Sequence, residues 1–269
     1  MSTSVASTVR DDRAAVDKAV SLLAAFGDGA SSGVGVSELA RRAGLSKSTA
    51  HRVLGHLERN GVVERVGTDY RLGERLHHLG RSVYAPGSEA VRDALLPFLT
   101  DLYETTRQTV HLAVLHGTDV VYLGKLYGHH APPVPSRIGG RLPAHATAVG
   151  KVLLAYQPDV FARLKEEPLR RFTDRTLTDH AALTVELDRI RRDGVAYDDE
   201  ESRPGLNCVA APVFAAGGRA VAALSVAAMR PRADARSWGP DVRRIAAEAS
   251  RTWALTRART RGDRDAVRA

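Results

Sequence analysis

Residues 36–72 constrain the fold of this chain most, because two short helices, a tight turn and a hairpin pattern follow one another there. Ser37 has a side chain suited to an N-cap, and Gly44 stands where a helix commonly ends in the left-handed conformation. Ser46 is the next N-cap, and apolar residues at spacings of three and four follow it. Small Ala40 allows the two helices to cross closely. The segment therefore predicts a helix-turn-helix.

The polar surface beside this turn is typical of a nucleic-acid contact. Residues 62–66 and 70–72 flank a turn at 67–69, which predicts a β-hairpin placed as a wing. Hydroxyls and cations at the start of the second helix suit phosphate oxygens and base edges in a major groove. The candidate DNA-binding residues are Ser37, Ser46, Lys47, Ser48, Thr49, His51, Arg52, Arg65, Tyr70 and Arg71. The alternative is a small helical module whose surface is only polar.

The charge balance favours an anionic partner but does not locate its binding surface. The 269 residues include 39 Lys and Arg against 31 Asp and Glu, a formal net charge of +8. This sign favours nucleic acid first and an anionic membrane second. Residues 37–71 hold seven basic and four acidic side chains, so the local excess is small. The prediction of DNA binding therefore rests mainly on the motif.

Several classes of protein are excluded by what the sequence lacks. A single cysteine, Cys208, rules out an internal disulfide. No apolar run reaches the roughly 20 residues of a membrane span, and the first residues lack the apolar core of a signal peptide. We expect a cytoplasmic protein with no membrane partner.

The length of the chain and the positions of its glycine and proline breaks predict two domains joined by a helix. An apolar helical stripe at 14–26 precedes the helix-turn-helix, so we assign 13–73 to the DNA-binding domain. Residues 74–87 form the expected linker helix and end at a Pro-Gly break, and 88–259 form the second domain. The polar, charged stretch 260–269 is expected to be a disordered tail.

The second domain mixes helical and strand-like segments. Apolar spacing predicts helices at 88–106, 145–156, 181–193 and 241–259. Strand patterns occur at 109–116, 120–127, 195–198, 208–214 and 221–228. This mixed order predicts an α+β domain with a largely antiparallel sheet.

Two runs in this domain resemble a known family. They are GVAYDDEESRPGLNCVAAPVF at 194–214 and LPAHATAVGKVLLA at 142–155. Together with the Ser-Lys-Ser-Thr helix start at 46–49 and the tyrosine-containing wing, they resemble the IclR family of bacterial regulators over nearly the whole chain. The resemblance implies a winged helix-turn-helix followed by a GAF-like effector domain. It also implies a homodimer or tetramer, paired through its N-terminal and linker helices, on a near-palindromic operator.

The resemblance further implies regulation of a catabolic or metabolic operon, more often by repression, in response to a small organic or aromatic acid. Backbone N–H groups of Ala148 and Val149 are implied to hold the ligand carboxylate, which suits the unpaired donors of a helix N-terminus. The other implied pocket residues are Asp198, Cys208 and Ser225. Ala227 stands at a position that is polar in such members, which disfavours a very small acid such as glyoxylate and favours a larger, more apolar one.

His145 and Arg137 are further candidates for effector contact, although His145 equally suits a helix cap and Arg137 a surface position. Two other functions would use the histidines and the cysteine. Cys208 with His145 could form a nucleophile and base, but no motif supplies the orienting group, so no enzyme is expected. A metal-sensing regulator could use His129, His130, His145 and Cys208, although their spacing matches no standard zinc pattern. We therefore predict no metal and no cofactor.

Overall fold

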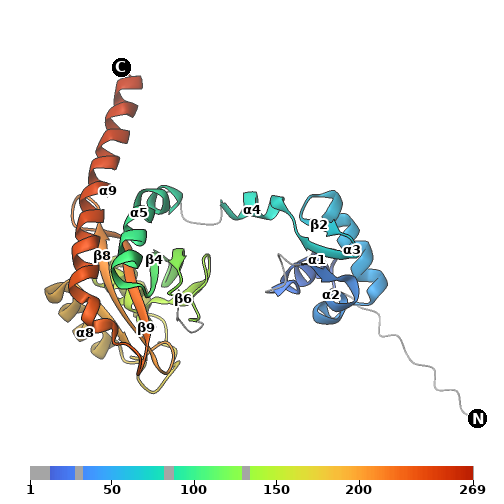
Figure 1. Cartoon of the computed structure of the whole chain (residues 1–269). Helices are drawn as coiled ribbons and strands as arrows, with labels where there is room; N and C mark the ends of the chain where they lie inside the picture. The colour runs from blue at the N-terminus through green and yellow to red at the C-terminus, as the bar shows by residue number, and fades with distance from the viewer. Residues whose placement is uncertain (1–12, 28–32, 82–87, 129–133, 269) are drawn as a thin grey trace, which may run out of the picture. The chain divides into compact units, whose positions relative to one another are not determined.

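The computed structural model describes residues 13–27, 33–81, 88–128 and 134–268, and it divides into two compact units, Met1–Tyr84 and Ala85–Ala269 (Figure 1). The described part of the first unit holds four helices and a small sheet. Its elements are α1 (Ala15–Ala24), β1 (Val34–Gly35), α2 (Val36–Ala43), α3 (Lys47–Arg59), β2 (Val63–Val66), β3 (Asp69–Leu72) and α4 (Glu74–Arg81).

The turn between α2 and α3 forms as the sequence predicts. Gly44 has φ 63°, in the left-handed region, and caps α2. The N–H of Leu45 then donates to Ala40 O at 2.9 Å. Ser46 Oγ accepts the N–H of Thr49 at 3.2 Å and begins α3. Ala40 is buried, so the two helices contact each other through a small side chain.

The wing is a three-stranded antiparallel sheet in the order β1-β3-β2. Strand β1 was not expected, because a two-residue strand leaves no periodicity to detect. Val34 pairs with Tyr70 in this strand and brings the chain to α2 in an extended conformation. The helix therefore begins at Val36 with Gly35 at the N-cap, and no side chain caps it. The prediction that Ser37 is an N-cap is wrong; Ser37 lies in the first turn.

The second unit contains a longer sheet and most of the helices. Its elements are α5 (Ser88–Thr106), β4 (Thr109–His116), β5 (Asp119–Leu126), β6 (Arg141–Pro143), η2 (Ala144–Ala146), α6 (Ala148–Ala155), α7 (Pro158–Leu164), α8 (His180–Asp193), β7 (Ala196–Asp199), β8 (Leu206–Phe214), β9 (Ala220–Met229), η3 (Ala235–Trp238) and α9 (Gly239–Arg268).

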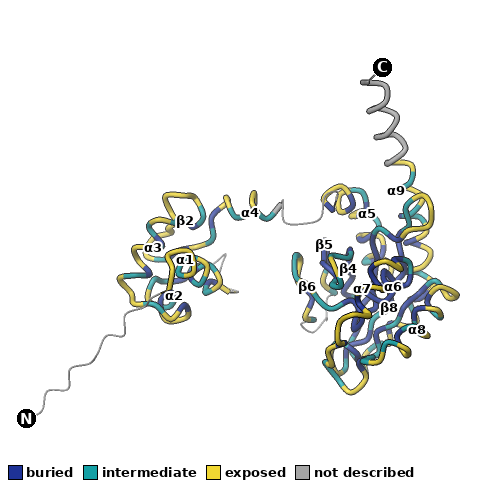
Figure 2. Tube along the Cα trace, turned by 180° about the vertical axis from the view of Figure 1, so that it is seen from behind, coloured by how far each residue is buried: buried dark blue, intermediate teal, exposed yellow. Residues whose placement is uncertain are grey.

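The sheet of the second unit has the order β6-β5-β4-β9-β8-β7, and every neighbouring pair is antiparallel. Helices α5 and α9 pack together on one face, and α6, with α7 and α8 beyond it, covers the other (Figures 1 and 2). All eight residues of α6 are buried. The predicted α+β class with an antiparallel sheet is confirmed.

The larger differences from the sequence prediction are two helix boundaries and two elements that it missed. The helix expected from residue 145 starts at Ala148, because the chain first forms the 3₁₀ turn η2 and then an extended Thr147. Strand β6 and helix α7 are too short to show a clear period. Helix α9 continues through Arg268, where a disordered tail was expected, since extending a formed helix adds one hydrogen bond per residue and no proline interrupts it. Among the described residues, no helix is long and apolar enough to cross a membrane.

Candidate DNA-binding surface and ligand pocket

The start of α3 presents a polar, cationic surface. Lys47, Ser48, His51 and Arg52 are exposed on it, while Ala50 and Leu54 face the core and are fully buried. The hydroxyl of Ser46 lies 3.1 Å from Ser48 Oγ and donates to Thr49 Oγ1 at 2.9 Å. These hydroxyls therefore support the helix start, and the side chains one turn later extend into solvent.

Several basic side chains of the first unit are already paired. Arg41 and Arg42 both bind Glu38, at 2.6 to 2.8 Å, and these arginines lower the pKa of Glu38 to about 2. Arg71 donates to Glu64 Oε2 from Nε at 2.8 Å and Nη2 at 2.6 Å, which lowers the pKa of Glu64. The number of basic residues in the first unit therefore overstates the positive charge available to bind DNA.

Of the three wing residues predicted to contact DNA, two are exposed and one is buried. Arg65 and Arg71 are exposed on the hairpin. Tyr70 is only 3% exposed and packs in the core of the first unit, so its assignment as a DNA contact is wrong. Tyr70 lies on β3, the central strand of this sheet, where it pairs with the buried Val34.

A pocket opens in the second unit, with about 350 Å³ of free space that includes a part open to solvent. It lies where β4, β5, β8 and β9 meet the start of α6 and the residues that follow β7. Five predicted effector residues line it together, and so does the substituted position Ala227. Its lining comprises His111, Tyr122, Val134, Pro135, Ser136, Leu142, Thr147, Ala148, Val149, Asp198, Ser202, Leu206, Cys208, Ser225 and Ala227.

One wall of the pocket is the N-terminus of α6. Thr147 Oγ1 accepts the N–H of Gly150 at 3.1 Å, which leaves the amides of Ala148 and Val149 without a partner inside the helix. A Cβ at Gly150 would lie 2.1 Å from Ala144 O, so only glycine lets this helix start so close to η2. Two backbone donors with partial positive charge thus face the pocket.

Another part of the lining is a buried chain of polar side chains. His111 Nε2 lies 2.7 Å from Ser136 Oγ, and His111 Nδ1 lies 3.3 Å from Ser225 Oγ. Burial, together with the nearby charge of Lys125, lowers the pKa of His111 to about 3. A neutral imidazole donates through one nitrogen and accepts through the other, so this wall can both donate to and accept from a ligand.

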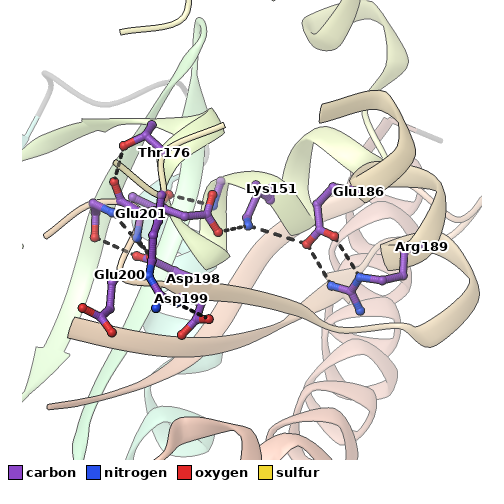
Figure 3. A network of polar contacts seen from close by, with 12 residues as sticks. Lys151, Thr176, Glu186, Arg189, Asp198, Asp199, Glu200 and Glu201 are labelled. Carbon is purple, nitrogen blue, oxygen red and sulfur yellow. Dashed lines mark hydrogen bonds and ion pairs between the residues drawn. The ribbon is translucent and has the colours of Figure 1, made fainter. Parts of the chain in front are cut away.

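Asp198 also lines the pocket. Its polar contacts are drawn in Figure 3. Its Oδ1 accepts the N–H of Glu201 at 2.7 Å, and its Oδ2 accepts the hydroxyl of Ser202 at 2.7 Å. Burial raises its pKa. Behind it, Lys151 of the buried helix α6 forms an ion pair with Glu201 and lies 3.6 Å from Glu186. Asp198 therefore links the pocket to a buried network of charged side chains.

The remaining predicted residues lie elsewhere. His145 Nε2 contacts Arg170 O at 2.9 Å, and neither it nor the exposed Arg137 lines the pocket. Burial raises the pKa of the Cys208 thiol well above its usual value, which opposes a thiolate nucleophile. The proposed metal ligands His129 and His130 lie outside the described residues. Within the described residues, no group of three or more His, Cys, Asp or Glu side chains is placed to hold a metal ion.

The sequence prediction missed the polar residues His111, Tyr122, Ser136, Thr147 and Ser202. Thr147 carried a local signal, because a threonine three residues before Gly150 is placed as an N-cap for α6. The others carried none, since the contact of His111 with Ser136 and Ser225 joins segments that are distant in sequence.

A winged helix-turn-helix and a second unit with a pocket lined by polar and apolar residues define the class of ligand-responsive DNA-binding regulators. The family model described as the bacterial transcriptional regulator IclR C-terminal domain matches residues 85–253, and the IclR helix-turn-helix domain matches residues 15–67. The chain belongs to the IclR family. It is a DNA-binding transcriptional regulator with an effector-binding domain.

Known relatives agree with this assignment. The HTH-type transcriptional regulator XynR of Escherichia coli (strain K12) is 38% identical over 223 residues, which cover 81% of this chain and 87% of the relative. The structure of Thermotoga maritima IclR is similar, with a TM-score of 0.75 and 30% identity over 89% of this chain and 98% of that one. An IclR homolog from Microbacterium hydrocarbonoxydans, crystallised with 4-hydroxybenzoate, has a TM-score of 0.72 and 29% identity, covering 90% of this chain and 100% of that one. The curated relatives are transcriptional regulators, which are not enzymes.

Proposed function

We propose that this regulator represses a catabolic or metabolic operon in the cytoplasm, and that a small carboxylic acid controls its affinity for the operator DNA. The observation that carries the proposal is the pocket, which joins the α6 N-terminus to a neutral polar wall around His111. Repression is supported by names among the relatives, including "Transcriptional repressor IclR" from Escherichia coli, 33% identical over 202 residues. The proposed function involves no catalysis.

The effector proposed is an acid with a sizeable apolar part. The amides of Ala148 and Val149 would bind its carboxylate, while Leu142, Leu206 and Ala227 would contact its body. The 4-hydroxybenzoate bound by the Microbacterium hydrocarbonoxydans homolog is an acid of this kind.

A thermal-shift screen tests the effector class. Benzoate, 4-hydroxybenzoate and other aromatic and aliphatic acids are compared with their neutral amides, which keep the shape and remove the charge. At least one acid should raise Tm and its amide should not, because only the anion is stabilised by the helix N-terminus. Asp198→Ala with Cys208→Ala should abolish that shift. If the double variant folds and responds like the wild type, the pocket assignment is wrong.

The DNA contacts proposed are Lys47 and Arg52 on α3, with Arg65 on the wing. Lys47→Ala with Arg52→Ala should weaken operator binding by at least about tenfold in a gel-shift assay, since each lost phosphate or base contact costs roughly 1–3 kcal/mol. A matched control is Lys165→Ala with Arg192→Ala, which removes the same charge from exposed sites in the second unit. Equal loss in both variants would point to net charge rather than to α3.

The operator proposed is near-palindromic, and the protein would bind it as a homodimer or tetramer. Exposed apolar side chains on α1 and α4 support pairing through these helices: Val16 is 71%, Val20 59% and Leu79 58% exposed. Val16→Asp with Val20→Asp should lower the mass measured by size-exclusion chromatography with light scattering. An unchanged mass would exclude α1 from the interface.

Control by the effector requires that the ligand bind the DNA-competent and DNA-free states with different affinities. The acid that raises Tm should therefore shift the operator dissociation constant, by a factor that fluorescence anisotropy can measure. Ligand binding without any change in operator affinity would contradict regulation through this pocket.

A further inference from the structure

Gly55 occupies the middle of the exposed face of α3. It follows His51 by four residues and Arg52 by three, and it precedes Arg59 by four, so it neighbours all three on the helix surface. These three side chains are exposed, whereas Ala50 and Leu54 face the core. Gly55 thus lies between these exposed side chains of the proposed DNA surface.

Glycine is an unfavourable choice for this position. It loses more conformational freedom than alanine when a helix forms, and a helix interior containing it is less stable. Gly55 lies well inside the thirteen-residue α3, where it neither caps nor ends the helix. The first unit is therefore less stable with glycine at residue 55 than it would be with alanine there.

No contact within the described part of the chain requires a glycine at residue 55. A Cβ at Gly55 would meet only the guanidinium of Arg59, at 3.9 Å, and its φ is not in the left-handed region. The contrast with Gly73 and Gly150 is clear, because a Cβ there would lie 2.4 Å from Gly61 O and 2.1 Å from Ala144 O. Those two glycines are needed by the fold, and Gly55 is not.

We propose that Gly55 is a close-approach point at which the backbone of α3 meets the operator DNA, and that it sets how deeply the helix enters the major groove. An α-helix with its side chains is about as wide as that groove, so the side chain at the centre of the facing surface fixes the separation. With no side chain at residue 55, His51, Arg52 and Arg59 can reach base edges and phosphates on either side. Gly55 is therefore a determinant of specific binding, although it makes no polar contact of its own.

The inference rests on α3 being the DNA-reading helix, as proposed above. It predicts opposite effects on two properties. Adding a side chain at residue 55 should stabilise the fold, because helix propensity rises and no clash results. The same change should weaken specific DNA binding, because the helix is held away from the bases.

Gly55→Ala and the longer Gly55→Gln test this. The probe is the duplex most enriched by the wild-type protein from a randomised pool, with a scrambled duplex of the same composition as the non-specific reference. Fluorescence anisotropy at fixed salt should show operator affinity falling about 3- to 10-fold for Gly55→Ala and at least about 30-fold for Gly55→Gln. Affinity for the scrambled duplex should change less than about twofold, because it depends on phosphate charge. Tm should rise for Gly55→Ala.

Val185→Ala on α8 is the control, because it raises helix propensity at an exposed position of the second unit, away from the proposed DNA and pairing surfaces. It should raise Tm and leave operator affinity unchanged, with light scattering confirming the oligomeric state of every variant. If Lys47→Ala with Arg52→Ala weakens operator binding while both Gly55 variants bind like the wild type, the role of Gly55 is overturned and that of α3 stands. If neither set weakens binding, the proposed DNA surface itself fails. A fall in Tm for Gly55→Ala would also overturn the inference, by showing that the fold needs this glycine.

Discussion

Asp198 Oδ1 accepts the backbone N–H of Glu201 at 2.7 Å, and the side chain of Glu201 in turn forms an ion pair with Lys151 (Figure 3). The first residue of this series lines the pocket, and the last lies on α6, the helix whose N-terminus faces the same pocket. Glu186, 3.6 Å from Lys151, extends the series to α8. A ligand that contacts Asp198 is therefore connected through charged groups to two helices on one face of the sheet.

Removing the charge of Lys151 should strongly destabilise the second unit. Lys151→Met leaves Glu201 buried without its cation, and breaking a buried ion pair in this way costs about 3–5 kcal/mol. Lys151→Met with Glu201→Gln should recover a large part of that loss, since the uncompensated charge is gone. Urea denaturation of the wild type, both single variants and the double variant gives the coupling energy. Additive losses would contradict the pairing, and Lys165→Met, at an exposed site, serves as the control.

His111 should stay neutral well into the acidic range. Its pKa is lowered to about 3 mainly by burial, whereas an unfolded histidine titrates near 6.5. Between these values the unfolded chain binds the extra proton, so the contribution of His111 to stability is complete above pH 6.5 and is lost as the pH falls toward 3. The raised pKa values of Asp198 and Glu201 act with the opposite sign, so the total stability does not isolate this effect.

NMR of the imidazole resonances makes the measurement specific to one side chain. The His111 signals, assigned through a His111→Gln variant, should not move between pH 7.5 and pH 5. A titration midpoint near 6.5 would show that the imidazole of His111 is solvated, which would contradict a neutral polar wall in the pocket.

A side chain at Gly150 should disrupt the start of α6. In Gly150→Ala the new Cβ would lie 2.1 Å from Ala144 O, so the helix must move away from η2. Overpacking of this kind costs about 1–3 kcal/mol or more, and the displaced amides of Ala148 and Val149 should also lose ligand. Thermal unfolding with and without the acid found in the screen measures both effects. Wild-type Tm together with wild-type ligand response would refute the close packing.

Glu64 should oppose DNA binding through its ion pair with Arg71. Glu64→Gln removes a carboxylate from the wing and leaves Arg71 able to reach a phosphate. Operator affinity should rise by about two- to fivefold at low salt, and the gain should shrink as salt screens the charge. Asp159→Asn on α7, which removes an exposed acid from the other unit, should leave affinity nearly unchanged. An equal gain in that control would assign the effect to net charge.

Local features of the sequence were enough to predict the helix-turn-helix and its wing. Gly44 ends α2 in the left-handed conformation and Ser46 caps α3, because both effects depend on residues within one turn of the chain. The wing register follows from alternation around a short turn. The same local rules failed at Ser37, where pairing of Val34 with Tyr70 decided the helix start, and at Tyr70, which that pairing buries.

Local patterns along the chain were enough to predict the order and type of most elements, and the resemblance to a family pointed to Ala148, Asp198 and Ser225. The contacts of His111 with Ser225 and of Lys151 with Glu201 emerged only in the packed fold, because they join strands and helices far apart in the chain. Burial then set their chemistry, since a histidine without solvent stays neutral and a buried lysine requires a partner. Side-chain charge can be read from the sequence, but the dielectric surroundings that control it depend on the packed fold.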